Sequence, residues 1–326
     1  MLHFICLYII FEMVVLHMHT KHGSPGFFAN CIRRRYLLAM AIPGALWMLV
    51  FNYAPMYGLI MAFTDYSITK PILGSPWAGA RYFLEYFRND YFRVTLQNTL
   101  GISLLKLVIA FPFSIFFAIL LNEIMHSRLK KIIQTITYLP HFLSWTVLGA
   151  IVITWFSEAG PVNDILVNKL GIMTEPVSFL SEPDYFWPLA VGTEIWKETG
   201  WNTIIFLAAI TGIDPELYES ASLDGAKRHH KMWYITLPCI SGIIALMFIL
   251  NVGYLLNSNF DQIMILTNQL NLPKSLTIDL YVYRTGITNG RFSYATAIGL
   301  AKSFVMVLLL LFANTTTKRL TGKSMF

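Results

Sequence analysis

Long apolar segments constrain this chain more than any other feature of its sequence. A helix needs about 20 consecutive, mostly apolar residues to cross the core of a bilayer. Six segments approach or exceed that length, at 36–63, 95–121, 132–156, 187–211, 238–257 and 296–314. Of the 326 residues, 56% are hydrophobic and only 13% are charged, whereas about 25% charged residues are usual in soluble domains. The sequence therefore predicts an all-α, polytopic membrane protein with six transmembrane helices.

The expected domain organisation is an N-terminal cytoplasmic or interfacial tail, residues 1–35, followed by one six-span unit, residues 36–326. No repeat of about 20–50 residues divides that unit. Residues 1–15 are apolar, but they are short and contain Glu12, which makes them a poor signal peptide and a poor span. Two interpretations stay open for them: an interfacial tail, or residues read from a start codon placed too far upstream.

Neither the histidines nor the cysteines predict a metal site or a disulfide. His17, His19 and His22 follow the apolar N-terminus closely, but no carboxylate or cysteine stands beside them. The three cysteines are far apart in the chain and form no CxxC pair, so we expect free thiols in apolar surroundings. They are Cys6, Cys31 and Cys239.

The distribution of Lys and Arg predicts the orientation. With the N-terminus inside, the inner segments hold thirteen Lys and Arg residues and the outer segments hold eight, spread over longer loops. Because basic residues accumulate on the cytoplasmic side, both termini and residues 212–237 are expected in the cytoplasm. The formal charge of +6 would suggest nucleic acid in a soluble protein, but this distribution indicates a bilayer partner and no nucleic acid.

Charged residues inside the predicted spans are the candidates for a substrate pathway. Each costs at least about 2.5–3.5 kcal/mol if it faces lipid at the centre of a span, so it should face a cavity, form a pair or snorkel. Two interpretations stay open: lysines that snorkel beside a structural ion pair, or the polar lining of a path for a hydrophilic substrate, with two tryptophans as stacking platforms. The candidate pathway residues are Lys106, Glu194, Trp196, Lys197, Trp201, Asn251, Tyr254, Asn257 and Lys302.

No catalytic constellation stands out, and the sequence predicts a protein that is not an enzyme. No HExxH motif and no Ser/His/Asp arrangement is evident. Gly322-Lys323-Ser324 is like the end of a phosphate loop, but Thr317 stands where that motif needs its first glycine. If transport uses a nucleotide, we expect another chain to bind it.

The polar segment between the fourth and fifth predicted spans carries helix signals. Asp214 is a candidate N-cap, followed by Pro215 at the first helical position. Gly225 stands where a helix ends in a left-handed residue, and a second helix is predicted from Ala226 to about residue 235. On a membrane face, such a helix–turn–helix is a docking element for a soluble partner.

This segment resembles the cytoplasmic signature of permease subunits of binding-protein-dependent ABC importers. That signature reads Glu-Ala-Ala, three residues, Gly, nine residues, then Ile-x-Leu-Pro. Every spacing matches, and the one departure is a serine at the first alanine. The matching residues are Glu219, Ser220, Ala221, Gly225, Ile235, Leu237 and Pro238.

Further stretches are similar to the polysaccharide or oligosaccharide branch of that family. They are 138–145 (YLPHFLSW), 160–163 (GPVN), 260–262 (FDQ) and 281–284 (YVYR), so the resemblance extends from about residue 36 to the end. It implies a bacterial cytoplasmic-membrane protein that works with a second, related permease, two ATPase subunits and an extracytoplasmic solute-binding protein. It also implies that this chain binds no cofactor, because ATP and Mg belong to the partner ATPase.

The resemblance gives the polar segment a coupling role. The two short helices are expected to sit in a cleft of the ATPase, with Gly225 at the turn and Ala221 and Ala226 permitting close approach. Asp224 completes the set of expected coupling residues. The implied substrates are oligosaccharides, acidic ones included, which Lys106, Lys197 and Lys302 would suit if they face the cavity.

A different class of protein, an ion-coupled secondary transporter, is the alternative. Such a transporter would use carboxylates within the membrane and inverted repeats. Only Glu194 and Glu198 could serve as the carboxylates, and no internal symmetry is visible in the sequence.

Overall fold

The computed structural model describes residues 35–321 of the chain. The predictions for the N-terminal tail, for His17, His19, His22, Cys6 and Cys31, and for the last five residues lie outside the described part. Within residues 35–321 the fold is all-helical, and the one β-feature is an isolated antiparallel bridge between Thr64 and Trp77. The chain divides into two compact units, residues 1–79 and 80–326.

The described part of the first unit is one long helix followed by a loop. Helix α3 (Arg35–Met48) continues through a π-helical turn (Leu49–Tyr53) into a 3₁₀ helix (Ala54–Phe63). Pro55 lies at the start of the 3₁₀ segment, where the changes of helix type accommodate a residue that cannot donate an amide hydrogen bond. Residues Ala39–Phe63 are long and apolar enough to cross a membrane.

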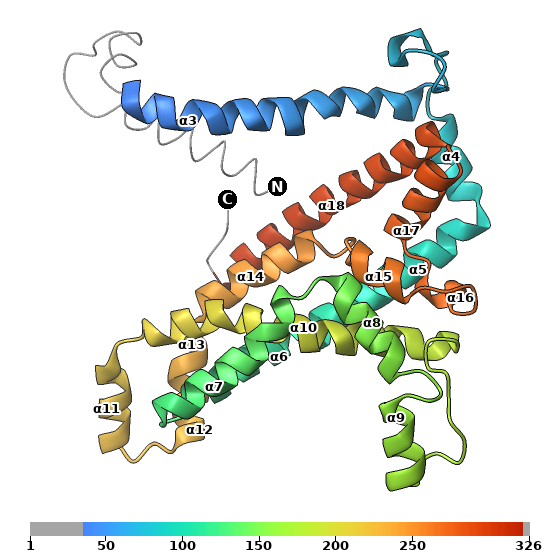
Figure 1. The fold of residues 1–326 in the computed structure, drawn as a ribbon. Coiled ribbons are helices and arrows are strands. Elements are labelled where there is room, and N and C mark those ends of the chain that lie inside the picture. Colours follow the sequence, from blue (N-terminus) through green and yellow to red (C-terminus); the bar gives the residue numbers. More distant parts are fainter. Residues whose placement is uncertain (1–34, 322–326) are drawn as a thin grey trace, which may run out of the picture. The chain divides into compact units, whose positions relative to one another are not determined.

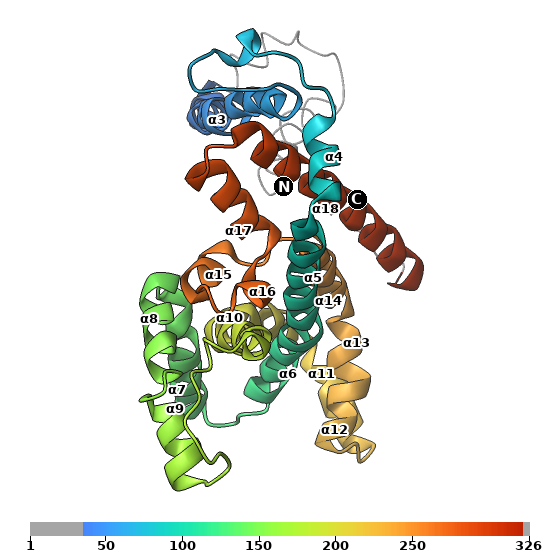
Figure 2. The same ribbon diagram turned by 90° about the vertical axis from the view of Figure 1, so that its right-hand side faces the viewer.

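The second unit contains the other long helices (Figures 1 and 2). Helix α5 (Asp90–Leu105) joins α6 (Phe111–Asn122) through a π-helical turn (Lys106–Ala110), so that Asp90–Asn122 forms one candidate span of 33 residues. Helix α18 (Phe292–Thr321) contains the next candidate span, Phe292–Arg319. Its large apolar side chains Phe304 and Phe312 are exposed, as expected where a bilayer surrounds the helix.

Two further candidate spans are bent. Helix α7 (Ser127–Tyr138) continues into the turn Leu139–Phe142, and α8 (Trp145–Trp155) follows at 101° to it. The segments Arg228–Cys239 and Ser241–Gly253, the latter helix α14, meet at 62°. By length and composition the described chain thus has three to five candidate spans.

Helix α10 (Phe186–Thr211) accounts for the difference from the six predicted spans. It is 26 residues long, but it carries Glu194, Lys197 and Glu198, so composition alone does not identify it as a span. It packs between α6 and α7 near the centre of the second unit (Figure 2). Gly200 allows the close approach to α7, because a Cβ there would lie 2.1 Å from the Thr137 carbonyl oxygen.

Short helices complete the second unit. Three of them, α15, α16 and α17, follow one another between α14 and α18. They are α4 (Arg81–Arg88), α9 (Pro161–Asn163), α11 (Pro215–Leu223), α12 (Arg228–Lys231), α13 (Leu237–Cys239), α15 (Phe260–Leu266), α16 (Leu272–Ser275) and α17 (Ile278–Tyr283).

Two short helices, α11 and α12, form the polar segment between α10 and α14. The side chain of Asp214 caps α11 by accepting a hydrogen bond of 3.0 Å from the Glu216 amide. At the other end, Gly225 has φ +78°, and the Ala226 amide donates to the Ala221 carbonyl at 2.9 Å. This is the left-handed ending that glycine favours. The second helix begins at Arg228 rather than at Ala226, because its N-cap residue, Lys227, has an extended backbone with φ −72° and ψ 163°.

Candidate functional site

A polar pocket of about 210 Å³ lies in the second unit where α5, α6, α10 and α14 meet. Its lining combines amide, hydroxyl and charged side chains with a few apolar ones. The lining residues are Ser103, Lys106, Leu107, Ala110, Phe111, Ser114, Glu194, Glu198, Thr199, Asn202, Phe206, Met247, Asn251, Tyr254, Leu255, Asn257 and Asn259. Polar groups gathered in this way inside an apolar bundle are suited to a hydrophilic ligand.

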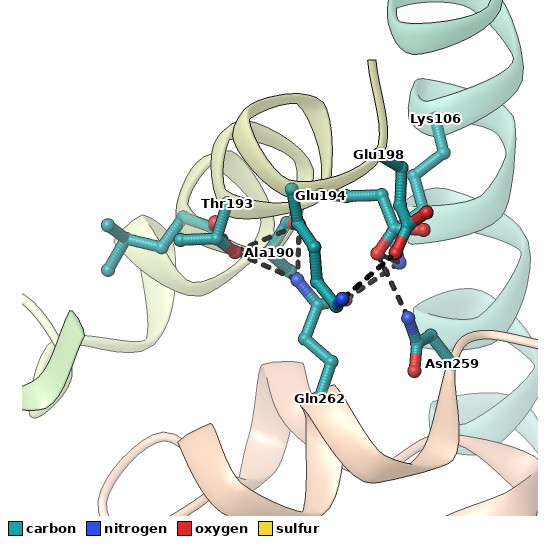
Figure 3. Close-up of polar contacts among 9 residues, drawn as sticks. Lys106, Ala190, Thr193, Glu194, Glu198, Asn259 and Gln262 are labelled. Carbon is teal, nitrogen blue, oxygen red and sulfur yellow. Dashed lines mark hydrogen bonds and ion pairs between the residues drawn. The ribbon is translucent and has the colours of Figure 1, made fainter. Parts of the chain in front are cut away.

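An ion pair between Lys106 and Glu194 forms one wall of this pocket (Figure 3). The Lys106 Nζ lies 3.2 Å from Glu194 Oε2, and the two side chains are 14% and 19% exposed. Lys106 also donates to Gln262 Oε1 at 2.7 Å. The Asn259 amide donates to the same Glu194 oxygen at 3.0 Å. One carboxylate oxygen therefore accepts from two donors on different helical segments.

Gln262 fixes the position of this pair. Its side chain is fully buried, and its Nε2 donates to the Ala190 carbonyl at 2.7 Å and to Thr193 Oγ1 at 2.8 Å (Figure 3). Because its Oε1 accepts from Lys106, every polar atom of the side chain has a partner. Gln262 thus joins α15 to α10 and holds Lys106 at the edge of the pocket.

Asn259 has an unusual backbone. Its φ of 60° and ψ of 78° make it the one non-glycine residue with positive φ in the described chain, directly before α15. Asparagine tolerates this conformation better than most residues, whereas other side chains pay about 1–2 kcal/mol. The strained residue therefore lies where its side chain reaches Glu194.

We expect Asn259→Gly to be more stable than Asn259→Ala by about 1 kcal/mol, because both lose the amide but only alanine keeps a Cβ at positive φ. Thermal unfolding of the detergent-purified protein measures the difference. Asn257 is the matched control, because it lies in the same pocket but does not have a positive φ. Its glycine variant should therefore be no more stable than its alanine variant. Equal midpoints for the two Asn259 variants would contradict this account of the backbone.

The structure brings five of the predicted pathway residues together in the pocket. They are Lys106, Glu194, Asn251, Tyr254 and Asn257. The sequence reasoning did not include Gln262, Asn202 or the hydroxyls of Ser103, Ser114 and Thr199 among its candidates. The FDQ stretch at 260–262 was the available signal for Gln262, but only as part of a family resemblance.

The two tryptophans lie outside this pocket, and the prediction that they line the substrate pathway stays a prediction. Trp196 stacks on Trp155 with ring centroids 5.8 Å apart, in a separate, mainly aromatic pocket. Trp201 stacks on His141 at 4.3 Å. For Trp196 the physical reason is helical periodicity: at about 100° per residue, it lies roughly 200° around α10 from Glu194. Trp201, seven residues from Glu194, lies on a similar side of α10, and its ring is stacked on His141.

Lys197 and Lys302 also lie outside this pocket. The Lys197 Nζ lies 3.4 Å from Glu198 Oε1 and donates to the His141 carbonyl at 2.6 Å. Lys302 pairs with Asp279 between α17 and α18. All three lysines within the predicted spans are therefore paired with a carboxylate.

The coupling residues predicted from the sequence lie on one exposed element. Glu219, Ser220, Asp224, Gly225 and Pro238 are exposed. Ala221, Ala226, Ile235 and Leu237 are half-buried. The two halves of the element are tied together by Tyr218 to Thr236 at 2.9 Å and by Lys231 to Ser222 at 2.6 Å. Leu223, 90% exposed at the tip, is an apolar group available to a partner.

The fold defines a membrane-embedded, multi-pass protein whose helices line a polar pocket. Residues 110–322 match the binding-protein-dependent transport system inner membrane components, and the chain belongs to this family. It is 44% identical over 299 residues to Protein LplB of Bacillus subtilis (strain 168), which covers 90% of this chain and 92% of that protein.

Other similar proteins are named after their substrates. The polygalacturonan/rhamnogalacturonan transport system permease protein YteP of Bacillus subtilis (strain 168) is 40% identical over 289 residues, covering 88% of this chain and 89% of that protein. A chain of a bacterial ABC transporter involved in the import of the acidic polysaccharide alginate matches with a TM-score of 0.83 and 37% identity, covering 90% of this chain and 99% of that chain.

A second structure of an alginate ABC transporter, in complex with an alginate pentasaccharide-bound periplasmic protein, matches with a TM-score of 0.84 and 36% identity. It covers 91% of this chain and 99% of that chain. By family the chain is an inner membrane component of a binding-protein-dependent transport system, and it is similar in sequence and structure to permeases of sugar ABC transporters. Several of its relatives are named as permease proteins of transport systems.

Proposed function

We propose that this chain is one of two related permease halves in an ATP-driven oligosaccharide importer of the bacterial cytoplasmic membrane. The observation that carries the proposal is the polar pocket, which offers amides, hydroxyls and a fixed ion pair inside an apolar bundle. Sugars present many hydroxyls and few apolar surfaces, so such a lining can replace their hydration. The relatives named as sugar permeases support the same substrate class.

We propose six spans, with α10 as the fourth. Its length of 26 residues suffices to cross a bilayer, and its charged residues are paired rather than free. Both termini and the α11–α12 element then lie in the cytoplasm, in agreement with the excess of Lys and Arg on that side.

We propose that the α11–α12 element docks on a cytoplasmic ATPase, one of two in the complex. ATP and Mg bind to that partner, and this chain receives the movement through α11 and passes it to α10 and α14. The exposed tip and the hydrogen bonds that tie the two short helices together support a rigid lever. A second permease and an extracytoplasmic solute-binding protein complete the proposed assembly.

Co-purification tests this assembly. The affinity-tagged chain, expressed from its own operon and solubilised in mild detergent, should bring down a nucleotide-hydrolysing subunit and a second permease. Isolation of the chain without either would contradict the proposal and would favour the ion-coupled alternative. That alternative has little support in the pocket, because its two carboxylates, Glu194 and Glu198, are each paired with a basic side chain.

We propose that the substrate is an acidic oligosaccharide, as it is for the alginate importer and as the name of YteP indicates. The support comes from these relatives rather than from free lysines. A uronate that reaches Lys106 has to compete with Glu194, which already accepts from Lys106 and Asn259.

Glu194→Gln should therefore raise the uptake of oligouronides relative to neutral oligosaccharides. The glutamine keeps the shape and an oxygen that can accept from Asn259 and Lys106, and Gln262 still accepts from Lys106, so the ammonium keeps its hydrogen bonds but loses its counter-charge. Hydrogen bonds to charged groups contribute about 1.5–3 kcal/mol, so we expect a change in the uptake ratio of about tenfold or more. Uptake of labelled oligosaccharides by whole cells measures it.

The control is Asp164→Asn, which removes one negative charge from an exposed ion pair with Lys169 outside the pocket. It should leave the ratio unchanged. A Glu194→Gln variant that takes up both classes of sugar in the wild-type ratio would contradict the proposal that Lys106 meets the substrate's carboxylate.

A further inference from the structure

The break between α7 and α8 lies against a cluster of charged and aromatic side chains from α10. The two helical segments meet at 101°, and residues Leu143 and Ser144 between them are extended. A broken helix leaves carbonyl groups without their intrahelical partners, and these need other donors inside a membrane. The carbonyl in question belongs to His141, because the Pro140 carbonyl already accepts from the Leu143 amide at 3.2 Å.

Lys197 supplies the donor. Its Nζ lies 2.6 Å from the His141 carbonyl oxygen and 3.4 Å from that of Pro140, and the residue is only 5% exposed. The ammonium also lies 5.8 Å from the ring centroid of Trp145, the first residue of α8. One buried lysine thus contacts both sides of the break.

Glu198 links this contact to the pocket. Its Oε1 lies 3.4 Å from Lys197 Nζ, and its Oε2 lies 2.7 Å from His141 Nδ1. The same side chain lines the polar pocket and is 22% exposed. A hydroxyl group in the pocket that donates to Glu198 would compete with Lys197 and His141 for the same two oxygens.

We propose that Lys197 is a positioning residue that fixes the angle between α7 and α8, and that Glu198 makes this angle respond to what occupies the pocket. The proposal rests on the proposed function, since it requires a sugar in the pocket. It gives Lys197 a role in transport without contact with the substrate.

Distance measurements between spin labels on α7 and α8 test the positioning role. Single cysteines at Ile136 and Ile153, both exposed, carry the labels in a background in which Cys6, Cys31 and Cys239 are replaced by serine. The full transporter complex in membranes should show one narrow distance distribution that shifts on addition of oligosaccharide. Lys197→Met should broaden it and abolish the shift, and Lys197→Arg should restore both.

The control is Lys302→Met, which removes another lysine paired within the bundle, away from the break. It should leave the distribution between the labels unchanged. The ratio of substrate-stimulated to basal ATP hydrolysis should fall roughly threefold or more in Lys197→Met. Glu198→Gln, which weakens the link between the lysine and the pocket, should lower the same ratio and provides the test if Lys197→Met does not accumulate.

An unchanged distance distribution and an unchanged stimulation ratio in these variants would overturn the inference and leave the proposed function intact. Failure of the wild-type complex to import any oligosaccharide would instead contradict the proposed function. The two failures are therefore distinguishable.

Discussion

Gly225→Val is expected to accumulate in the membrane at close to the wild-type level and to lose most of its transport, by at least about tenfold. Gly225 has φ +78°, and an added Cβ would meet nothing within 4 Å in this chain. The variant therefore pays only the cost of a side chain in the left-handed region, about 1–2 kcal/mol, with no clash inside the subunit. The larger effect is expected at the surface that meets the ATPase, where the turn between α11 and α12 is exposed.

Gly171→Val is the matched control for this prediction. Gly171 has φ +61° and also open space around the position of a Cβ, so the backbone cost is similar. It lies in the loop before α10, which the proposed topology puts on the side opposite to the ATPase. Uptake and membrane accumulation of both variants should be measured together. Equal loss of uptake in the two would show that backbone strain alone is responsible and would contradict the docking role of the turn.

Lys106→Met is expected to have the largest effect on stability. It leaves the Glu194 carboxylate with Asn259 as its one remaining donor and removes the partner of the fully buried Gln262 oxygen. Removing one partner of a buried ion pair costs about 3–5 kcal/mol, and the partial exposure of both side chains favours the lower end. Transport should be lost together with most of the folded protein.

The double variant Lys106→Met/Glu194→Gln separates charge from packing. It removes the uncompensated carboxylate, so it should recover most of the stability that Lys106→Met loses. Thermal unfolding of the four proteins in a double-mutant cycle measures the coupling between the two positions, and we expect about 1–3 kcal/mol. A double variant no more stable than Lys106→Met would contradict the pairing of these residues in the folded protein.

Local features were the most accessible from the sequence. Asp214 as a helix cap and Gly225 as a left-handed ending depend on a few neighbouring residues, and the structure confirms both. Five of the six apolar segments coincide with candidate straight or bent spans for the same reason. The exception, α10, carries three charges, and its identity as a span depends on partners elsewhere in the fold.

The composition of the pocket was only partly accessible. Lys106 and Glu194 could be proposed as pathway residues because a charged residue within a span is costly unless it faces a cavity or a partner. Their pairing could not be predicted, because the two positions are 88 apart in sequence. Gln262 is 156 positions from Lys106 in sequence. It lies on the short helix α15, which no periodic pattern of apolar residues predicts. The position of Trp196 could be foreseen, because the helical period places it about 200° around α10 from Glu194, whereas that of Trp201, seven residues from Glu194, depends on its stacking on His141.

Uptake into proteoliposomes tests the central claim most directly. The purified complex is reconstituted with ATP inside or outside the vesicles, the solute-binding protein on the opposite side, and a labelled oligosaccharide. The account predicts accumulation that requires ATP hydrolysis and the binding protein and that persists when ionophores abolish the proton and sodium gradients. Accumulation that is independent of ATP and disappears with the ion gradients would contradict it.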